Sequence, residues 1–202
     1  MGLLASSATF VRYSVEGDLP NNFWDFAAEQ IAARSFRDID DNYEEISIGW
    51  VSVLNMFDAE FSYASYAAGD YIVLTLRIDE RKVSPKALKK FCLKEEERIK
   101  KERQVPKLSR NQKLEIKENV KLMLTKKAVP VPATYDLCWN LGENTLFFFS
   151  TNQKAQEILA DFFKETFGLN LMLQVPYLIA EHLLDPDAQL SLAEIRPAIF
   201  VG

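Results

Sequence analysis

The stretch "SPKALKKFCLKEEERIKKERQVPKLSRNQKLEIKENVKLMLTKK", residues 84–127, predicts two helices in the middle of a chain of 202 residues. Ser84 followed by Pro85 is typical of a helix start, because a capping side chain precedes a proline at the first helical position. Pro106 ends this helix, since proline removes a backbone donor and disfavours helix at the residue before it. The pattern therefore predicts one helix before Pro106 and one after it.

The second helix has its own start signal. Ser109 and Gln112 form an S-x-x-Q capping box, in which each side chain can bind the backbone N–H of the other residue. Both helices then carry a narrow apolar seam, made of Leu88, Phe91, Cys92 and Ile99 on the first and Ile116, Val120, Met123 and Leu124 on the second. Because the link is short, we expect an antiparallel helical hairpin in which each helix covers the seam of the other.

The residues before this hairpin predict the order β-α-β-β. "ATFVRYSV" (8–15) and "ISIGWVSVL" (46–54) alternate in polarity as half-buried strands do. "GDLPNNFWDFAAEQIAARSF" (17–36) reads as a turn, an asparagine cap and a helix. "YIVLTLRI" (71–78) is an almost continuous apolar run, which is typical of an interior strand.

The residues after the hairpin predict β-β-α-β. "YDLCWNL" (135–141) and "TLFFFS" (145–150) form a predicted β-hairpin with a turn between them. A helix capped by Ser150 and Gln153 follows, then the alternating strand "LNLMLQV" (169–175) and a short closing helix.

Together these elements predict an α+β fold. Its body, residues 1–80 and 128–202, is a mostly antiparallel sheet with helices, and the basic helical hairpin, residues 81–127, is inserted into it. With 48% hydrophobic residues the chain can form a folded core.

No apolar stretch approaches the roughly 20 residues that span a bilayer, and the first residues lack a signal-peptide pattern. We therefore expect a cytoplasmic protein without a membrane partner.

Charge is distributed very unevenly along the chain. Residues 81–127 hold 17 Lys and Arg against 6 Asp and Glu, a net of +11. The remainder holds 7 Lys and Arg against 23 Asp and Glu, a net of −16, so that the whole chain carries −5. Such asymmetry concerns the partners of a protein rather than its fold.

The cations of the hairpin recur at helical spacing. They are Lys86, Lys90, Lys94, Arg98 and Lys101 on the first helix, and Lys113, Lys117 and Lys121 on the second. Like charges four residues apart destabilise a helix by about a few tenths of a kcal/mol each. Pairs from Glu96 to Lys100 and from Glu97 to Lys101 are expected to relieve the first helix, whereas no glutamate is placed to relieve the second.

An external polyanion is the natural complement of these stripes. The phosphates of double-stranded DNA form a regular anionic surface, and lysines that contact them carry no base-reading information. We predict sequence-independent binding of duplex DNA through the eight cations named above. Two alternatives stay open. The lysines can simply solvate the hairpin, or the hairpin can belong to a protein-interaction module in which it pairs with an acidic partner surface.

Catalysis is not predicted. Nucleases need carboxylates around a divalent metal, and the acidic link 38–45 before the second strand is typical of a solvated loop. Glu115 and Lys117 have the E-x-K spacing of some nucleases, but they lie in the middle of a predicted helix. Neither Cys92 nor Cys138 has a neighbour at metal-ligand spacing. We therefore predict no catalytic residue, metal or cofactor, and a metal-dependent exonuclease remains an alternative.

The order of these elements resembles the bacterial recombination-associated RdgC family. The resemblance is carried by "GWV" (49–51), by "SPKALKK" (84–90) and by "TYDLCWNLGENTLFFFSTNQKAQEIL" (134–159). It covers roughly residues 8 to 176. It implies a nucleoid-associated protein that binds double-stranded DNA without sequence preference, in recombination or replication. Family members are also often labelled exonucleases.

The resemblance further implies a homodimer and a RecA-type recombinase as partner. Relatives form a dimeric ring around the duplex, which the C-terminal part of the family helps to close. This chain ends at Gly202, so we expect a short version of the family without that part. The DNA-facing role falls on the same eight cations.

Overall fold

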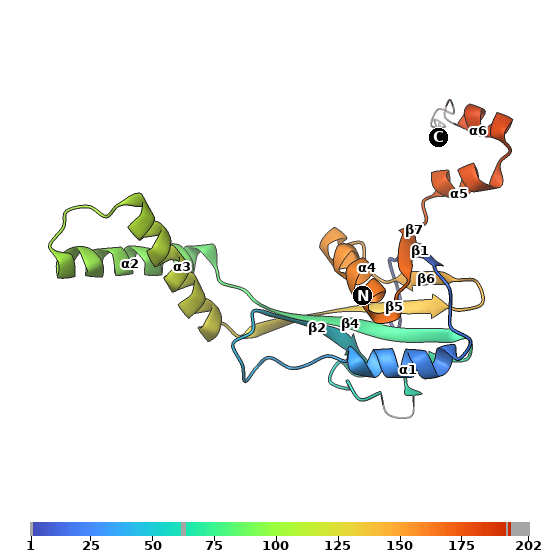
Figure 1. Cartoon of the computed structure of the whole chain (residues 1–202), viewed down its shortest axis with the longest axis horizontal. Helices are drawn as coiled ribbons and strands as arrows, with labels where there is room; N and C mark the ends of the chain where they lie inside the picture. The colour runs from blue at the N-terminus through green and yellow to red at the C-terminus, as the bar shows by residue number, and fades with distance from the viewer. Residues whose placement is uncertain (1, 62–63, 193, 195–202) are drawn as a thin grey trace. The chain divides into compact units, whose positions relative to one another are not determined.

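The structure is a computed structural model that describes residues 2–61, 64–192 and 194. Its elements in chain order are β1 (Val11–Glu16), α1 (Phe23–Ala33), β2 (Ile46–Val51), β3 (Ala67–Ala68), β4 (Tyr71–Arg81), α2 (Pro85–Arg103), α3 (Arg110–Lys127), β5 (Pro130–Asn140), β6 (Thr145–Phe148), α4 (Gln153–Phe167), β7 (Asn170–Leu173), α5 (Pro176–Leu183) and α6 (Pro186–Leu192) (Figure 1). The strand order is β2-β4-β5-β6-β1-β7, with β3 on β4. The predicted α+β fold with an antiparallel sheet and a helical insertion is confirmed, while β3 and α6 were not predicted.

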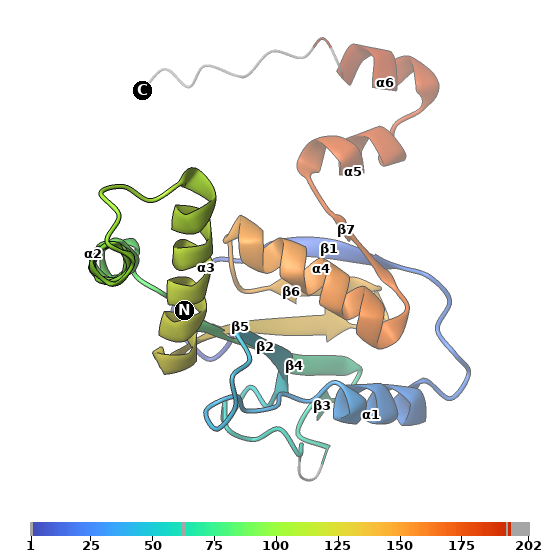
Figure 2. The ribbon, with the colours of Figure 1, turned by 60° about the vertical axis from the view of Figure 1, so that its left-hand side comes forward.

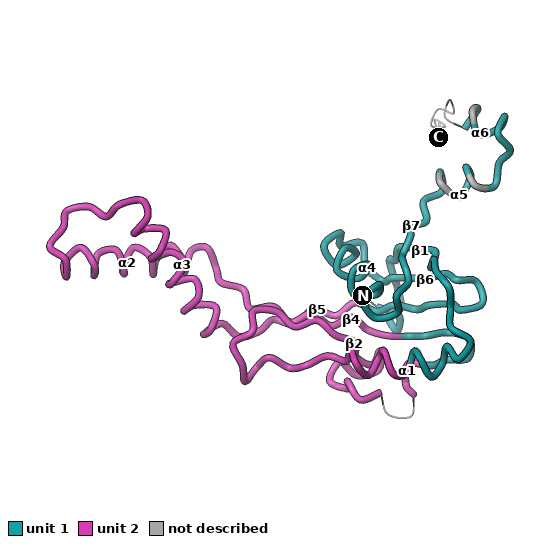
Figure 3. Tube along the Cα trace, in the orientation of Figure 1, with its two compact units in different colours: residues 1–27, 67–73, 136–202 teal, residues 28–66, 74–135 magenta. Residues whose placement is uncertain are grey.

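The chain divides into two compact units (Figure 3). Unit 1 contains Met1–Ala27, Ala67–Val73 and Asp136–Gly202, and unit 2 contains Ala28–Tyr66 and Leu74–Tyr135. Helix α1 and strands β4 and β5 each run from one unit into the other. The predicted division into a body and an inserted hairpin at 81–127 stays a prediction.

Unit 1 is built on an antiparallel sheet with aromatic packing. β6 pairs with both β5 and β1, and β1 also pairs with β7. Trp139 is fully buried, and its ring centroid lies 5.1 Å from that of Phe163 and 5.3 Å from that of Phe23. Helix α4 begins with Asn152, whose side chain accepts from the Ala155 N–H, and not with the predicted Ser150. These contacts fix α4 against the sheet of unit 1.

In unit 2, β2 and β4 pair antiparallel, and the short motif at Gly49 has a structural reason. Trp50 donates its backbone N–H to Arg34 and accepts from Phe36, each at 3.0 Å. This brings the Phe36 backbone so close that a Cβ on Gly49 would lie 2.2 Å from the Phe36 Cα. Only glycine fits there. The following Trp50 and Val51 are fully buried.

The hairpin in unit 2 has its own small apolar cluster. Its buried members are Leu108, Ile116 and Val120, with Leu88, Phe91, Cys92, Ile99 and Leu124 packed around them. The capping box is confirmed, because Ser109 Oγ accepts from the Gln112 N–H and Gln112 Oε1 accepts from the Ser109 N–H. The connection 104–109 begins with a left-handed residue, Gln104, with φ +54°.

The sequence predicted that the two helices of the hairpin lie antiparallel, side by side. In the structure they cross instead. Figure 2 views α2 almost end-on while α3 is seen lengthwise. No residue of α2 is buried, and of α3 only Ile116, Val120 and Thr125 are. The predicted apolar seams do meet, because Leu88, Phe91, Cys92 and Ile99 of α2 pack with Ile116, Val120 and Leu124 of α3, and two grooves are lined by residues of both helices. Among the described residues, no helix combines the length and the apolar character that crossing a membrane requires.

Candidate nucleic-acid interface

All eight predicted cations are exposed on the hairpin, but the crossing distributes them over different sides. Lys94, Arg98 and Lys101 line one groove, which we call the cationic groove; it is lined by Phe91, Lys94, Glu95, Glu97, Arg98, Lys101, Asn119, Val120, Met123 and Lys127. Lys113 and Lys117 line another, which we call the apolar groove; it is lined by Pro85, Leu88, Lys89, Cys92, Leu93, Glu96, Lys113 and Lys117. The cations of the two predicted stripes therefore line different grooves.

The other predicted cations lie outside these two grooves. Lys121 borders a third depression, which it shares with Arg81 and Lys82 but also with Glu45 and Glu80. Lys86 and Lys90 lie on exposed positions of α2, and Lys90 Nζ is 5.8 Å from the centroid of the Phe91 ring.

Arg98 is already neutralised by its own helix. Its guanidinium forms ion pairs with Glu95 at 2.7 Å and with Glu102 at 2.9 Å. The hydrogen bond between them raises the pKa of Arg98 and lowers the pKa of the Glu95 carboxyl. An anion that approaches Arg98 must compete with two carboxylates, so Arg98 is a weaker candidate than its position in the stripe indicates.

Lys113 is neutralised by the other helix. Its Nζ lies 3.7 Å from Glu96 Oε2, across the crossing of α2 and α3. The expectation that no glutamate relieves the second helix is therefore wrong. Within the first helix the predicted attractions of Glu96 for Lys100 and of Glu97 for Lys101 are present, although the ion pairs that form join Glu97 to Lys100 at 2.8 Å and Glu96 to Lys113.

Six predicted cations keep an available charge. In the part of the chain that the structure describes, no ion pair involves Lys86, Lys90, Lys94, Lys101, Lys117 or Lys121. Their ammonium groups stay solvated and repel one another along the helices. These six lysines, more than the stripes as a whole, are the candidate interface for an anionic partner.

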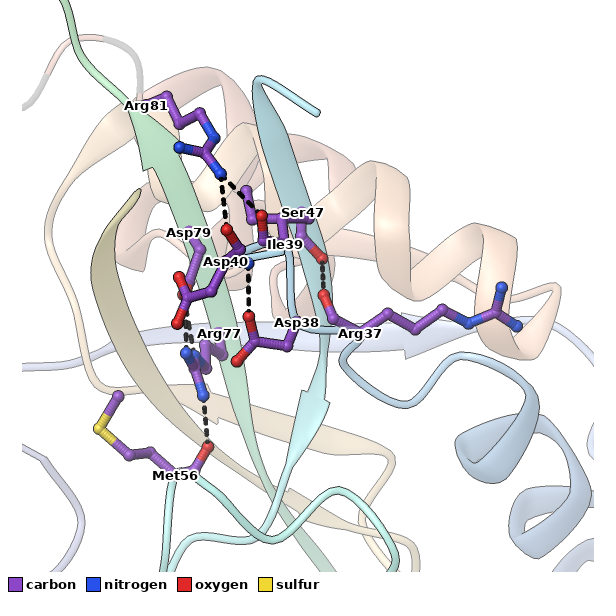
Figure 4. A network of polar contacts seen from close by, with 9 residues as sticks. All are labelled: Arg37, Asp38, Ile39, Asp40, Ser47, Met56, Arg77, Asp79 and Arg81. Carbon is purple, nitrogen blue, oxygen red and sulfur yellow. Dashed lines mark hydrogen bonds and ion pairs between the residues drawn. The ribbon is translucent and has the colours of Figure 1, made fainter. Parts of the chain in front are cut away.

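Arg81, at the start of the hairpin, has a structural role that the sequence did not reveal. It is buried, and its guanidinium donates to the backbone carbonyls of Ile39 at 2.7 Å, Asn42 at 2.9 Å and Glu44 at 3.1 Å. It also donates to Ala128, the residue after α3. Figure 4 shows its contacts with the acidic link. Arg81 thus joins the acidic link to the point where the second helix of the hairpin ends.

Arg77 lies on β4, four residues before Arg81, and forms a buried ion pair. Its Nε and Nη2 donate to the two carboxylate oxygens of Asp79 at 2.8 and 2.6 Å, and its Nη1 donates to the Met56 carbonyl (Figure 4). The guanidinium carbon lies 4.1 Å from the centroid of the Phe36 ring. The hydrogen bond with Asp79 raises the pKa of Arg77. This charge is unavailable to any external partner.

The acidic link shows no arrangement that favours metal binding. Asp38, Asp40 and Asp41 are exposed, and Asp38 Oδ1 accepts from the Asp40 N–H at 2.7 Å. Within the described residues, no group of three or more His, Cys, Asp and Glu side chains is placed to hold a metal ion. Glu115 and Lys117 lie in α3, as predicted, and both cysteines are free thiols.

Comparison with known families gives one match. A family sequence model described as "Putative exonuclease, RdgC" matches residues 11–182, which is most of the chain. A search among curated proteins found no matching relative. The matched region includes all of unit 2 with the whole hairpin, and residues 11–27, 67–73 and 136–182 of unit 1.

Proposed function

The chain belongs to the RdgC family, and from this premise we propose that it binds double-stranded DNA without sequence preference through the free lysines of α2 and α3. Membership of the family suggests a recombination-related nucleoid protein. A homodimer, and contact with a RecA-type recombinase in the cytoplasmic nucleoid, belong to the same proposal and follow from the resemblance alone.

The observation that supports DNA binding is the set of six lysines without an ion pair, all on the hairpin. Each phosphate that a lysine contacts releases condensed counterions, and this release drives sequence-independent binding. Lysine suits this role because its ammonium is a compact charge on a flexible stem, without the planar fork that reads guanine edges. The hairpin therefore offers charge for phosphates and little for base recognition.

A salt titration with duplex DNA of several sequences tests the proposal. If six lysines each contact one phosphate, the plot of log K against log[salt] has a slope of about −5, and sequence has little effect. Replacing Lys94 and Lys101 by Gln is expected to reduce the magnitude of the slope by about 2. The matched control is Lys154→Gln with Lys164→Gln, which removes the same charge from exposed positions of α4 in unit 1. No duplex binding at low salt, or an equal loss in the control, would contradict the proposal.

A second candidate function is a metal-dependent exonuclease, which the description of the family favours. The carboxylates to test are those of the acidic link, where Asp40 and Asp41 are exposed, although the described residues do not gather three such groups around one point. The measurement is release of labelled nucleotides from duplex ends with Mg²⁺ or Mn²⁺. If this site is catalytic, Asp40→Asn or Asp41→Asn abolishes the release, since the metal loses a charged ligand. Unchanged activity in both variants would rule out the site.

A further inference from the structure

The apolar groove of the hairpin places apolar side chains beside lysines, and only one of these lysines, Lys117, is among the six proposed to contact DNA. Its α2 side is one face of the helix, formed by Pro85, Leu88, Lys89, Cys92, Leu93 and Glu96, and its α3 side is formed by Lys113 and Lys117. The groove encloses about 450 Å³, and Leu93 leaves 54% of its surface exposed. An apolar floor thus lies between lysines of both helices.

The lysines of this groove are not equivalent. Lys113 is paired with Glu96 at 3.7 Å, so a carboxylate already lies beside the lysine at one end of the groove. Lys89 and Lys117 form no ion pair within the described ranges 2–61, 64–192 and 194. The groove therefore offers two available cations, one on each helix, beside the side chains of Leu88 and Leu93.

The composition of the groove favours one class of occupant. A DNA backbone would satisfy the lysines but would place polar sugar and phosphate against the leucines. The same groove of a second copy would satisfy the leucines but would bring Lys89 and Lys117 against identical lysines, and like charges across an interface cost several kcal/mol. Only a partner with both apolar side chains and carboxylates satisfies both parts of the groove.

We propose that the apolar groove binds an acidic amphipathic segment of a partner protein. In the helical form of such a segment, apolar side chains at positions i, i+3 or i+4, and i+7 lie on one face, which matches the floor formed by Leu88, Cys92 and Leu93. Carboxylates beside this face then contact Lys89 and Lys117. The site lies on a different side of the crossing from the cationic groove of Lys94 and Lys101.

The test uses a fluorescein-labelled synthetic peptide with leucines at helical spacing and glutamates at the other positions, and a scrambled peptide of the same composition. Binding is measured by fluorescence anisotropy to the full chain. We expect the patterned peptide to bind more tightly than the scrambled one by about tenfold, because only the former presents a continuous apolar face. Equal binding of both peptides would overturn the proposal, since charge alone would then explain it.

Variants locate the peptide on the groove. Leu93→Ser is expected to weaken binding of the patterned peptide by about fivefold, and Lys117→Gln weakens it as well. Leu93 is largely exposed, so its replacement leaves the circular dichroism spectrum and Tm unchanged. Lys94→Gln with Lys101→Gln lowers DNA binding but leaves peptide binding unchanged. If the last variant weakens the peptide as much as Leu93→Ser does, the proposed site is wrong, whatever the result with DNA.

Cys92 provides an independent reporter, because it lines the groove, while Cys138 lies in β5 of unit 1. Burial raises the pKa of both thiols, so alkylation is followed at mildly alkaline pH. The patterned peptide is expected to slow alkylation of Cys92 but not of Cys138, as measured by mass spectrometry of the digested protein. No protection of Cys92 by the patterned peptide, or equal protection by the scrambled peptide, would contradict the proposal.

Discussion

The arginines of β4 and the cations of the hairpin carry the same charge within one unit, yet they differ in what they can bind. Arg77 and Arg81 have only 6% and 9% of their surface exposed, and their donors are occupied by a carboxylate or by backbone carbonyls. Lys94 and Lys101 are exposed and form no ion pair with any described residue. Burial and neighbours, more than charge, decide which cations remain available to a partner.

This difference predicts a difference in energetics. Removing one member of a buried, hydrogen-bonded pair leaves a charge without compensation and costs several kcal/mol. Exposed ion pairs contribute only about 0–1 kcal/mol. Replacements on β4 are therefore expected to affect stability, and replacements on the hairpin are expected to affect binding.

The largest effect is expected from Asp79→Ala, which leaves the buried guanidinium of Arg77 without its carboxylate. The free energy of unfolding should fall by about 3–5 kcal/mol, as measured by urea denaturation. The double variant Arg77→Met with Asp79→Leu removes both charges, and it should recover much of this loss. A double variant that is less stable than Asp79→Ala would show that the pair stabilises unit 2 in a way that apolar packing cannot replace.

A somewhat smaller loss of stability is expected from Arg81→Met. The change removes the donor that serves the carbonyls of Ile39, Asn42 and Glu44, although some of these can turn to water. We expect the free energy of unfolding to fall by about 2–4 kcal/mol. The matched control is Arg37→Met, at an exposed arginine directly before the acidic link. It should change the free energy of unfolding by no more than about 0.5 kcal/mol. Equal effects of the two changes would show that the carbonyl contacts of Arg81 contribute little.

The comparison can be sharpened on the hairpin by releasing a cation that is now paired. Glu95→Gln with Glu102→Gln removes both partners of Arg98 and adds one available cation to the cationic groove. We expect tighter duplex binding and a salt slope steeper by about 0.9, which is the value for one further phosphate contact. Glu157→Gln with Glu165→Gln, on α4 of unit 1, changes the net charge equally and serves as the control. An unchanged slope would indicate that Arg98 does not face the DNA.

Much of the fold could be predicted because it rests on local signals. The start of α2 at Pro85, the capping box of α3 and the alternation in β1 and β5 all depend on residues close in sequence. Where two local signals for a helix start lie close together, the sequence does not decide between them. In "STNQ", residues 150–153, Ser150 and Asn152 can both cap a helix, and the backbone selects Asn152.

For the candidate site, the sequence predicted which residues are exposed cations, but it did not predict how these residues are arranged in space. The spacing of the lysines identified exposed positions, but the crossing of α2 and α3 depends on how their side chains pack together, which spacing along one helix does not reveal. The partners of Lys113 and Arg81 come from other segments, at Glu96 and around Ile39, which no periodicity reveals. The burial of Arg77 could not be recognised in the apolar run 71–78, because it depends on the ion pair with Asp79, which lies just beyond that run.

The smallest expected effect concerns the exposed pair of Glu95 and Arg98. The hydrogen bond from Arg98 lowers the pKa of Glu95 in the folded protein. A carboxyl with a lowered folded pKa contributes stability above its unfolded pKa, and this contribution is lost as the pH falls through the folded value. In Arg98→Gln, the pKa of Glu95, followed by NMR of its side-chain carboxyl carbon, is expected to return toward the ordinary value for glutamate. Added salt should shift it in the same direction in the unchanged protein, because exposed pairs are screened. If neither change moves the pKa of Glu95, the ion pair is absent in solution, and Arg98 joins Lys94 and Lys101 as an available cation.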